Sequence, residues 1–296
     1  MKIFMLLVSM FFISPFLNAK INVVTASMDL KSIAEFVGGD KVNVESIVHG
    51  AQDLHFVEPR PSMVMKIKKA DIIVKIGLDL DMWMDSLIAA SKNKKVSYGE
   101  IGYVDASKGI EKLEVPKTKV DSSMGDIHIY GNPHYWLDPL NGKIIAKNIL
   151  EGLIRISPQD ADYFKNNYEE FCKKIDEKMK IWHKKIKDLE GSSIITYHRS
   201  WIYFAKRFNL RIPIEIEPKP GIPPSPNHIL KVINTIRKEN VKIILVDNFY
   251  PLKAPKKISI ETGAKIVVVP SSVGGDKNVR DYFELFDYII SRLTED

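Results

Sequence analysis

Residues 161–189 read ADYFKNNYEEFCKKIDEKMKIWHKKIKDL and dictate the architecture of this chain. Their apolar members recur every three or four positions, so in a helix they share one face. These members are Ala161, Phe164, Tyr168, Phe171, Ile175, Met179, Trp182, Ile186 and Leu189. Just upstream, Ser157 can cap a helix that begins with Pro158, and Gly191 ends the pattern. About 30 residues at about 1.5 Å each extend about 45 Å, which predicts one stiff helix joining two lobes.

Short apolar runs alternate with helical patterns on both sides of this helix. Before it, we predict strands at Ile21–Ser27, Val42–Val48, Asp71–Gly77 and Lys95–Tyr98 and helices at Leu30–Val37, Pro61–Lys69 and Met82–Lys92. After it, we predict strands at Ser193–Tyr197, Leu210–Ile216, Lys242–Val246 and Lys265–Val269 and helices at Trp201–Phe208, His228–Glu239, Ala254–Thr262 and Val279–Arg292. Such alternation favours parallel sheets covered by helices. The predicted fold class is therefore α/β, with two lobes.

The predicted domain limits follow from these patterns. Residues 20–140 form the N-terminal lobe, 141–191 the linking helical segment and 192–296 the C-terminal lobe. Within the first lobe, residues 104–133 are polar and contain Pro116, Gly125 and Gly131. We therefore expect a long surface loop there, which is unusual enough to be either functional or simply mobile.

The composition and the N-terminal residues narrow the class of protein to which this chain can belong. A hydrophobic content of 45% and a charged content of 27% are typical of a globular protein. The net charge of +6 is spread along the chain without a dense basic block, so we expect no nucleic-acid partner. Residues 1–19 have a positive start, an apolar run and a small residue, Ala19, at the end. This pattern predicts a signal peptide, with a retained anchor as the alternative, and hence a periplasmic or extracytoplasmic protein.

Three histidines lie in well-separated, turn-rich segments: His55 in QDLHFVEP, His134 in GNPHYWLDP and His198 in ITYHRSW. Neutral imidazole is the commonest transition-metal ligand, and three distant ligands meet only in a folded cleft. His198 directly follows a predicted strand, and ligand groups gather at the carboxyl ends of parallel strands. A solvated or core role is expected for His49, His183 and His228, and a single histidine in the loop, His128, is weak evidence of a site.

Three histidines leave a fourth position of a tetrahedral metal site open. Asp247 directly follows the predicted strand KIILV and is our candidate for it, with a helix cap or a salt bridge as its alternative role. Glu217 and a water molecule are the other candidates. Asp53 and Glu58 flank His55 and could orient its ring as hydrogen-bond acceptors.

At these residues the chain resembles the metal-binding receptors of zinc and manganese ABC importers, known as cluster A-I. The matching segments are DLHFVEPRPS at 53–62, NPHYWLDP at 132–139 and TYH at 196–198, followed by Trp201 and Phe204. The resemblance implies two Rossmann-like lobes, a rigid linking helix and one metal ion between the lobes, with ligands at His55, His134 and His198. The family's fourth ligand is usually an acidic residue late in the chain, but residues 268–275 read VVPSSVGG here.

The predicted function is an extracytoplasmic receptor that captures Zn²⁺, or else Mn²⁺, and delivers it to an ABC membrane permease. Three imidazoles suit Zn²⁺ better than Mn²⁺, which prefers oxygen ligands. We expect a monomer without enzymatic activity, and no G-x-x-x-x-G-K-[ST] motif for ATP hydrolysis is present. One alternative is a secreted zinc-dependent hydrolase with the same three histidines, although the chain has no H-E-x-x-H or G-x-S-x-G motif. Another is a receptor for an organic ligand or a metal chelate.

Overall fold

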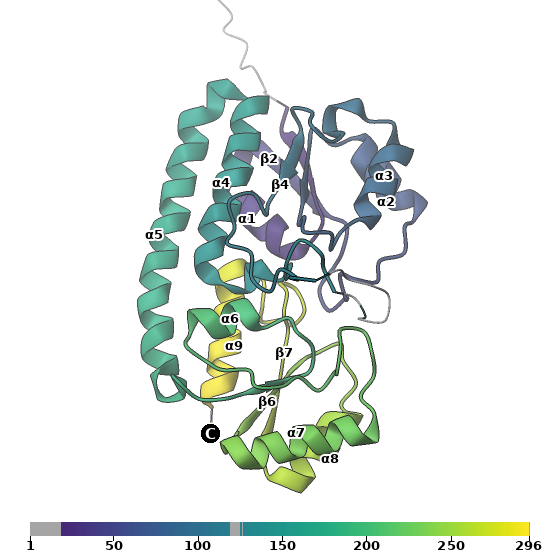
Figure 1. The fold of residues 1–296 in the computed structure, drawn as a ribbon. Coiled ribbons are helices and arrows are strands. Elements are labelled where there is room, and N and C mark those ends of the chain that lie inside the picture. The colour runs from purple at the N-terminus through teal and green to yellow at the C-terminus, as the bar shows by residue number, and fades with distance from the viewer. Residues whose placement is uncertain (1–18, 119–124, 126, 296) are drawn as a thin grey trace, which may run out of the picture.

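The computed structural model describes residues 19–118, 125 and 127–295, which form two α/β lobes beside one long helix (Figure 1). The N-terminal sheet contains β1 (Ile21–Thr25), β2 (Val42–Ser46), β3 (Ile72–Lys75) and β4 (Tyr103–Asp105). The C-terminal sheet contains β5 (Ile195–Thr196), β6 (Ile243–Asp247) and β7 (Lys265–Val269). The helices are α1 (Met28–Gly38), α2 (Pro61–Lys68), α3 (Trp83–Ser91), α4 (Pro139–Ile156), α5 (Ala161–Ile186), α6 (Ile202–Arg207), α7 (Pro226–Glu239), α8 (Lys253–Thr262) and α9 (Tyr282–Thr294). Apart from Ala19, the predicted signal peptide lies outside the described residues.

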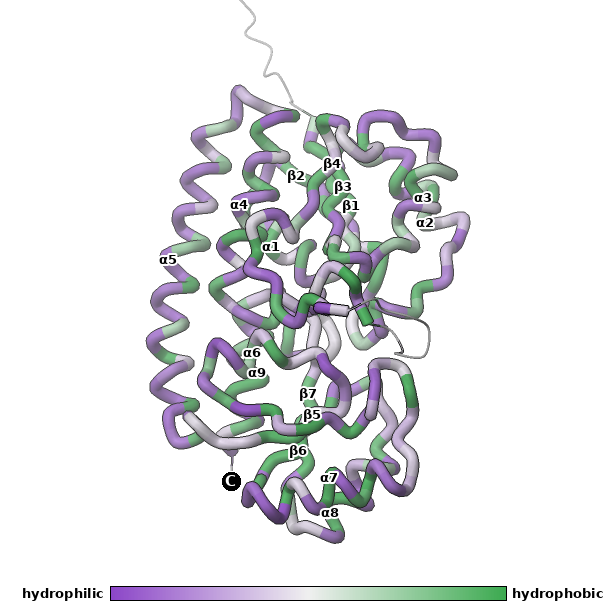
Figure 2. Tube along the Cα trace, viewed as in Figure 1, coloured by the Kyte–Doolittle hydropathy of each residue, from purple (hydrophilic) through white to green (hydrophobic). Residues whose placement is uncertain are grey.

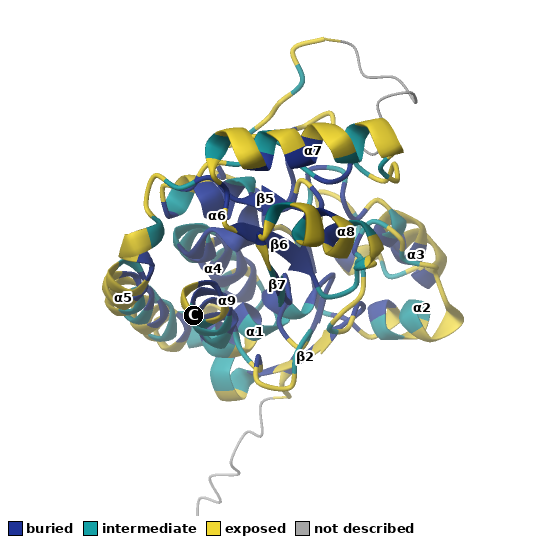
Figure 3. Ribbon diagram, turned by 90° about the horizontal axis from the view of Figure 1, so that it is seen from below, coloured by how far each residue is buried: buried dark blue, intermediate teal, exposed yellow. Residues whose placement is uncertain are grey.

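Both sheets are parallel, which confirms the predicted α/β class. Their strand orders are β2-β1-β3-β4 and β5-β6-β7. Parallel strands need cover on both faces, and every residue of β3 and β6 is buried. In Figure 1, α1 and α4 lie on one side of the first sheet and α2 and α3 on the other. Figure 3 shows the buried strands of the second sheet between α9 and the more exposed α7 and α8.

The long helix α5 has the predicted apolar stripe, and it connects helices from both ends of the chain. Its buried residues are Phe164, Phe171, Ile175, Met179, Trp182 and Ile186. The centroid of the Phe171 ring lies 5.3 Å from the ring centroid of Phe36 on α1 and 5.1 Å from that of Phe283 on α9. Figure 2 shows hydrophilic and hydrophobic residues alternating along α5, as expected for a helix with one buried face. The apolar stripe of α5, which we call the spine helix, therefore packs against helices of both lobes.

The start of α5 differs from the prediction. Helix α4 ends at Ile156, residues Pro158–Asp160 form a short 3-10 turn, and α5 begins at Ala161. The Ser157 hydroxyl donates to Asp160 Oδ2 at 2.6 Å rather than capping the long helix, so the predicted cap was wrong. The Ser157 side chain is thus used within the turn between α4 and α5, which pack against each other.

Two predicted strands were also wrong. Residues Lys94–Val96 form a 3-10 turn in place of a strand, and the fourth strand is β4 at the edge of the predicted surface loop. Leu210–Ile216 makes only isolated bridges, at Arg211 and Glu215. Pro213 lies at the centre of that run and has no backbone N–H to donate to a sheet.

The lobes touch at two glycines. Gly50, which follows β2, forms an isolated parallel bridge with Gly274, which follows β7. Gly50 has a φ of 53°, and a Cβ atom there would lie 2.5 Å from the Gly274 carbonyl oxygen. The segment leading to His55 is thus held against the C-terminal lobe. The domain limits stay a prediction, since α9 packs on α5 and α1 as well as on β7. Within the described ranges, no helix is both long and apolar enough to span a membrane.

Candidate metal centre

Three of the four predicted site residues converge at one place between the lobes. His55, His134 and His198 each offer a ring nitrogen, and these nitrogens lie within 4.8 Å of one another. The ring centroids are 5.2 Å apart for His55 and His134, 5.2 Å for His55 and His198, and 5.5 Å for His134 and His198. Zn–N bonds of about 2.0–2.1 Å place two nitrogens of a tetrahedral site about 3.3 Å apart. Small inward movements are therefore enough to reach a common ion.

His55 and His134 are positioned by the same pattern of local hydrogen bonds. Asp53 Oδ1 accepts from the His55 backbone N–H at 3.0 Å and from its ring Nδ1 at 2.7 Å. Asn132 Oδ1 accepts from the His134 backbone N–H at 3.0 Å and from its Nδ1 at 3.0 Å. In each case a side chain two residues upstream fixes both the turn and the ring. The predicted role of Asp53 is confirmed, whereas Glu58 is exposed.

Bonds from distant elements anchor these two turns. The indole of Trp83 on α3 donates to the Leu54 carbonyl at 3.1 Å. Asn132 Nδ2 donates to the Arg199 carbonyl at 2.8 Å, which connects the His134 turn with the residue after His198. Trp136 Nε1 donates to the Ser271 carbonyl at 2.9 Å, across to the loop after β7. The His134 and His198 segments are therefore connected directly, and the His55 segment is anchored to α3.

His198 follows β5, and its ring is oriented by Glu217. The Nδ1 of His198 donates to Glu217 Oε2 at 2.7 Å, and both side chains are buried. The same carboxylate oxygen accepts from the Gly221 backbone N–H at 3.3 Å. Glu217, a candidate for the fourth ligand, thus holds an imidazole in place in this structure.

Asp247 lies at the end of β6 and is fully buried. Its Oδ2 accepts from Trp201 Nε1 at 3.1 Å, while its Oδ1 has no hydrogen-bond partner among the described residues. Burial raises the pKa of this carboxyl. Asp247 does not belong to the group of converging ligand atoms, so its role as a metal ligand stays a prediction.

His128 lies beside this group, although its sequence context marked it only weakly. Its ring centroid is 5.3 Å from that of His55, and its Nδ1 is hydrogen-bonded to Asp79. Asp79 is 49 residues away in the sequence, so no local pattern could indicate the pair. The role of Asn132 was also missed, although the sequence contains a signal for it. The N-x-H spacing at 132–134 repeats the D-x-H spacing at 53–55.

The ring environments favour neutral imidazole at His134. Burial, and then the neighbouring histidines, lower the pKa of His134 well below its usual value. Burial also lowers the pKa of His198, but the hydrogen bond and charge of Glu217 outweigh it and the net pKa is raised. Because only the neutral ring can bind a metal, protons compete with metal at His198 more than at His134.

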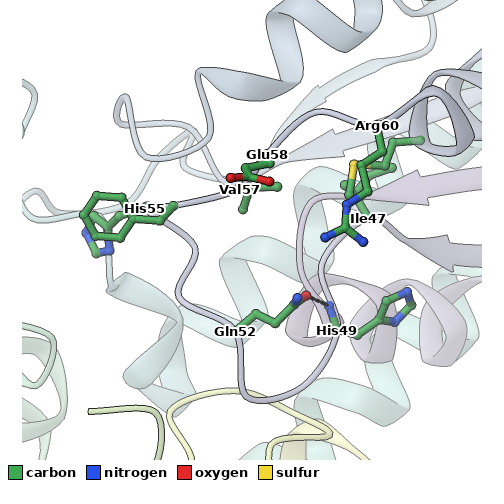
Figure 4. A pocket seen from close by; sticks show the side chains of 9 residues that line it. Ile47, His49, Gln52, His55, Val57, Glu58 and Arg60 are labelled. Atoms are coloured by element: carbon green, nitrogen blue, oxygen red, sulfur yellow. Dashed lines mark hydrogen bonds between the residues drawn. The ribbon is translucent and has the colours of Figure 1, made fainter. Parts of the chain in front are cut away.

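The spaces that reach the histidines are small. His134 and His198 line one cavity of about 40 Å³, and His55 and His134 line another of about 20 Å³. A larger open pocket of about 550 Å³ lies on the outer side of His55 (Figure 4), where Gln52 accepts from the His49 backbone N–H. Neither His134 nor His198 lines that pocket. The space between the histidines suits a single ion, since organic ligands occupy roughly 300–1,000 Å³.

The chain is similar in sequence to several known proteins. The sequence model of a family described as zinc-uptake complex component A, periplasmic, matches residues 23–296. The high-affinity zinc uptake system protein ZnuA of Bacillus subtilis (strain 168) is 26% identical over 266 residues, which cover 88% of this chain and 82% of that protein. The manganese ABC transporter substrate-binding lipoprotein PsaA of Streptococcus anginosus is 25% identical over 289 residues, which cover 93% and 89%.

A solved structure shares the fold. A crystal structure of ZnuA aligns with a TM-score of 0.79 and 23% sequence identity, covering 93% of this chain and 98% of that one. The two-lobed arrangement with its long helix therefore recurs in a protein with little sequence identity.

Proposed function

The chain belongs to the family of zinc-uptake complex component A, and on this premise we propose that it is the metal receptor of an ABC importer. It captures one divalent transition metal ion between His55, His134 and His198 and delivers it to a membrane permease. The convergence of these three rings in the space between the lobes carries the proposal. The relatives compared above act, by their names, in zinc uptake and in manganese ABC transport.

Zinc is the ion that this donor set suits best. The three converging groups are imidazoles, which suit Zn²⁺, whereas Mn²⁺ prefers carboxylate and water oxygens. Each Nδ1 donates to a side-chain oxygen, which leaves Nε2 as the basic nitrogen. We therefore place Zn²⁺ first and Mn²⁺ second. As the receptor of an importer, the protein works outside the cytoplasm, and we propose that it does so as a monomer.

The positions of the carboxylates favour a receptor over a zinc hydrolase. Hydrolysis at zinc needs a general base close to the bound water. The carboxylates of Asp53 and Glu217 accept hydrogen bonds from imidazole rings instead. The small cavities also argue against a receptor for an organic ligand or a chelate.

Titration of the metal-free protein with Zn²⁺ against a competing chelator tests the proposal. We expect one ion per chain and a rise in melting temperature, because the ion binds only the folded state. His134→Ala should weaken binding by orders of magnitude. His183→Ala is the matched control, since His183 is a half-exposed residue of α5 that does not belong to the group of converging ligand atoms. A melting temperature that Zn²⁺ and Mn²⁺ leave unchanged would contradict the proposal.

A further inference from the structure

The ring of His128 has a buried nitrogen, Nε2, that is a candidate metal ligand. Within the described part of the chain, its Nε2 has no hydrogen-bond partner, and neither has the Nε2 of His55. The two rings lie 5.3 Å apart, close to the separations within the three-histidine group. A buried polar nitrogen that forms no hydrogen bond destabilises the folded protein. A bound ion would satisfy both nitrogens together.

The ring of His128 is oriented as the other three are. Its Nδ1 is hydrogen-bonded to the Asp79 carboxylate, as the Nδ1 atoms of His55, His134 and His198 are bonded to side-chain oxygens. A histidine that binds metal through one nitrogen usually donates its other ring N–H to such an acceptor, which fixes the tautomer. His228 is different, because its Nε2 is bonded to the Glu215 carbonyl. His128 therefore has the orientation of a ligand.

The position of Asp79 is maintained against backbone strain. Leu78 and Asp79 have φ values of 50° and 60°, in the left-handed region that is strained for a residue other than glycine. In this conformation Asp79 Oδ2 also accepts from the Ile129 backbone N–H at 3.0 Å. The carboxylate therefore holds both the ring of His128 and the backbone next to it.

From these contacts we propose that His128, positioned by Asp79, is the fourth ligand of the metal ion, an inference that rests on the proposed function. Asp247 is the competing candidate, because its Oδ1 also has no partner among the described residues. His128, however, lines the same cavity as His134 and His198, and Asp247 does not. The nitrogen of His128 lies outside the group that converges within 4.8 Å, so its ring shifts inward on binding. Four imidazoles make an all-nitrogen site, which favours Zn²⁺ over Mn²⁺.

The test compares His128→Ala with three other variants in competition titrations with Zn²⁺ and with Mn²⁺. His128→Ala should weaken Zn²⁺ binding about 100-fold and Mn²⁺ binding much less, which lowers the selectivity for zinc. Asp79→Asn keeps an acceptor oxygen but loses its charge, and about a 10-fold loss of Zn²⁺ affinity is expected. His49→Ala is the matched control, because His49 lines the outer pocket and should leave binding unchanged. Asp247→Asn tests the competing ligand.

A spectroscopic readout counts the ligands independently of affinity. Co²⁺ in a tetrahedral site absorbs visible light strongly, and the wild type should show such bands while His128→Ala shows weaker, shifted ones. Unchanged Zn²⁺ affinity and unchanged Co²⁺ bands in His128→Ala would overturn the proposal, as would a loss of zinc confined to Asp247→Asn. If the wild type binds no metal at all, the receptor function itself fails. If only His134→Ala loses binding, the receptor stands and the role of His128 does not.

Discussion

The Nδ1 of His198 lies 2.7 Å from Glu217 Oε2, and this buried pair joins the end of β5 to a segment 19 residues further along the chain. The carboxylate orients the ring for metal binding, and its charge also makes the ring easier to protonate. The net pKa of His198 is raised for that reason, although burial acts in the opposite direction.

Replacing the charge of Glu217 should therefore change the pH dependence of metal binding. Glu217→Gln keeps an acceptor oxygen but loses the charge that raises the pKa of His198, so affinity should fall at a lower pH than in the wild type. At a pH above the pKa of His198 in either protein, we expect a 10–100-fold weaker affinity from the less basic ligand. Zn²⁺ titrations between pH 5 and 8 measure both effects, with Glu261→Gln on α8 as a half-exposed control. An unchanged pH midpoint would contradict this account.

The contact between Gly50 and Gly274 should be needed for both stability and affinity. Gly50→Ala places a Cβ atom against the Gly274 carbonyl oxygen and pushes the segment that carries His55 away from the other lobe. Gly191→Ala is the matched control, because Gly191 also has a positive φ, 77°, but no atom within 4 Å of the added carbon. Both variants should lose about 1–2 kcal/mol to backbone strain. Urea unfolding should show a further loss of stability, beyond this strain, in Gly50→Ala alone. Zinc titration should show at least a 10-fold loss of affinity in Gly50→Ala alone. Equal effects in the two variants would contradict a role for the Gly50–Gly274 contact.

Asp29 should make the metal-free protein less stable as the pH rises. It is fully buried and accepts from Ser272 Oγ at 2.5 Å and from the Val273 N–H at 2.9 Å, and burial raises its pKa to about 6 from 3.8. The folded state therefore holds this proton more tightly than the unfolded state does. The resulting stability is fully present below about pH 4 and is lost as the pH rises through about 6, by about 3 kcal/mol.

The variant Asp29→Asn isolates this contribution. It removes the ionisable group, so the free energy of unfolding should depend less on pH between about 4 and 6 than it does in the wild type. Urea titrations at several pH values in the presence of a chelator measure the slope. Asp81 also has a pKa raised to about 6 and remains in both proteins, which makes the difference between them specific to Asp29. Parallel pH profiles of the two proteins would disprove the assignment.

The spine helix should be sensitive to a cavity at Phe171. This side chain is fully buried between Phe36 of α1 and Phe283 of α9. Phe171→Ala should lower the free energy of unfolding by about 3–5 kcal/mol, since both the apolar burial and the packing on either side are lost. Lys173→Ala, two residues away on the exposed face of α5, should change it by less than about 0.5 kcal/mol. Equal losses of unfolding free energy in Phe171→Ala and Lys173→Ala would contradict a core role for Phe171.

Local patterns in the chain were sufficient to predict its fold class and to select three histidines that converge in the structure. The period of 3.6 residues from Phe164 to Ile186 defines the buried face of α5, because a helix presents such positions on one side. The turn-rich segments around His55, His134 and His198 identified these side chains as candidates that now lie together. The strand prediction at Leu210–Ile216 was wrong, because it rested on the apolar residues and gave too little weight to Pro213. Pro213 has no backbone N–H to donate, and the segment forms only isolated bridges.

Contacts between distant segments required the folded chain. Asp79 reaches His128 across 49 residues, Glu217 reaches His198 across 19, and Trp136 reaches Ser271 across 135. No periodicity or spacing encodes such pairs, because they depend on how the two sheets and the spine pack together. Short-range geometry thus specifies which residues belong to helices, strands and ligand-bearing turns. Long-range packing selects which nitrogen atoms face a common point and which carboxylates hold them there.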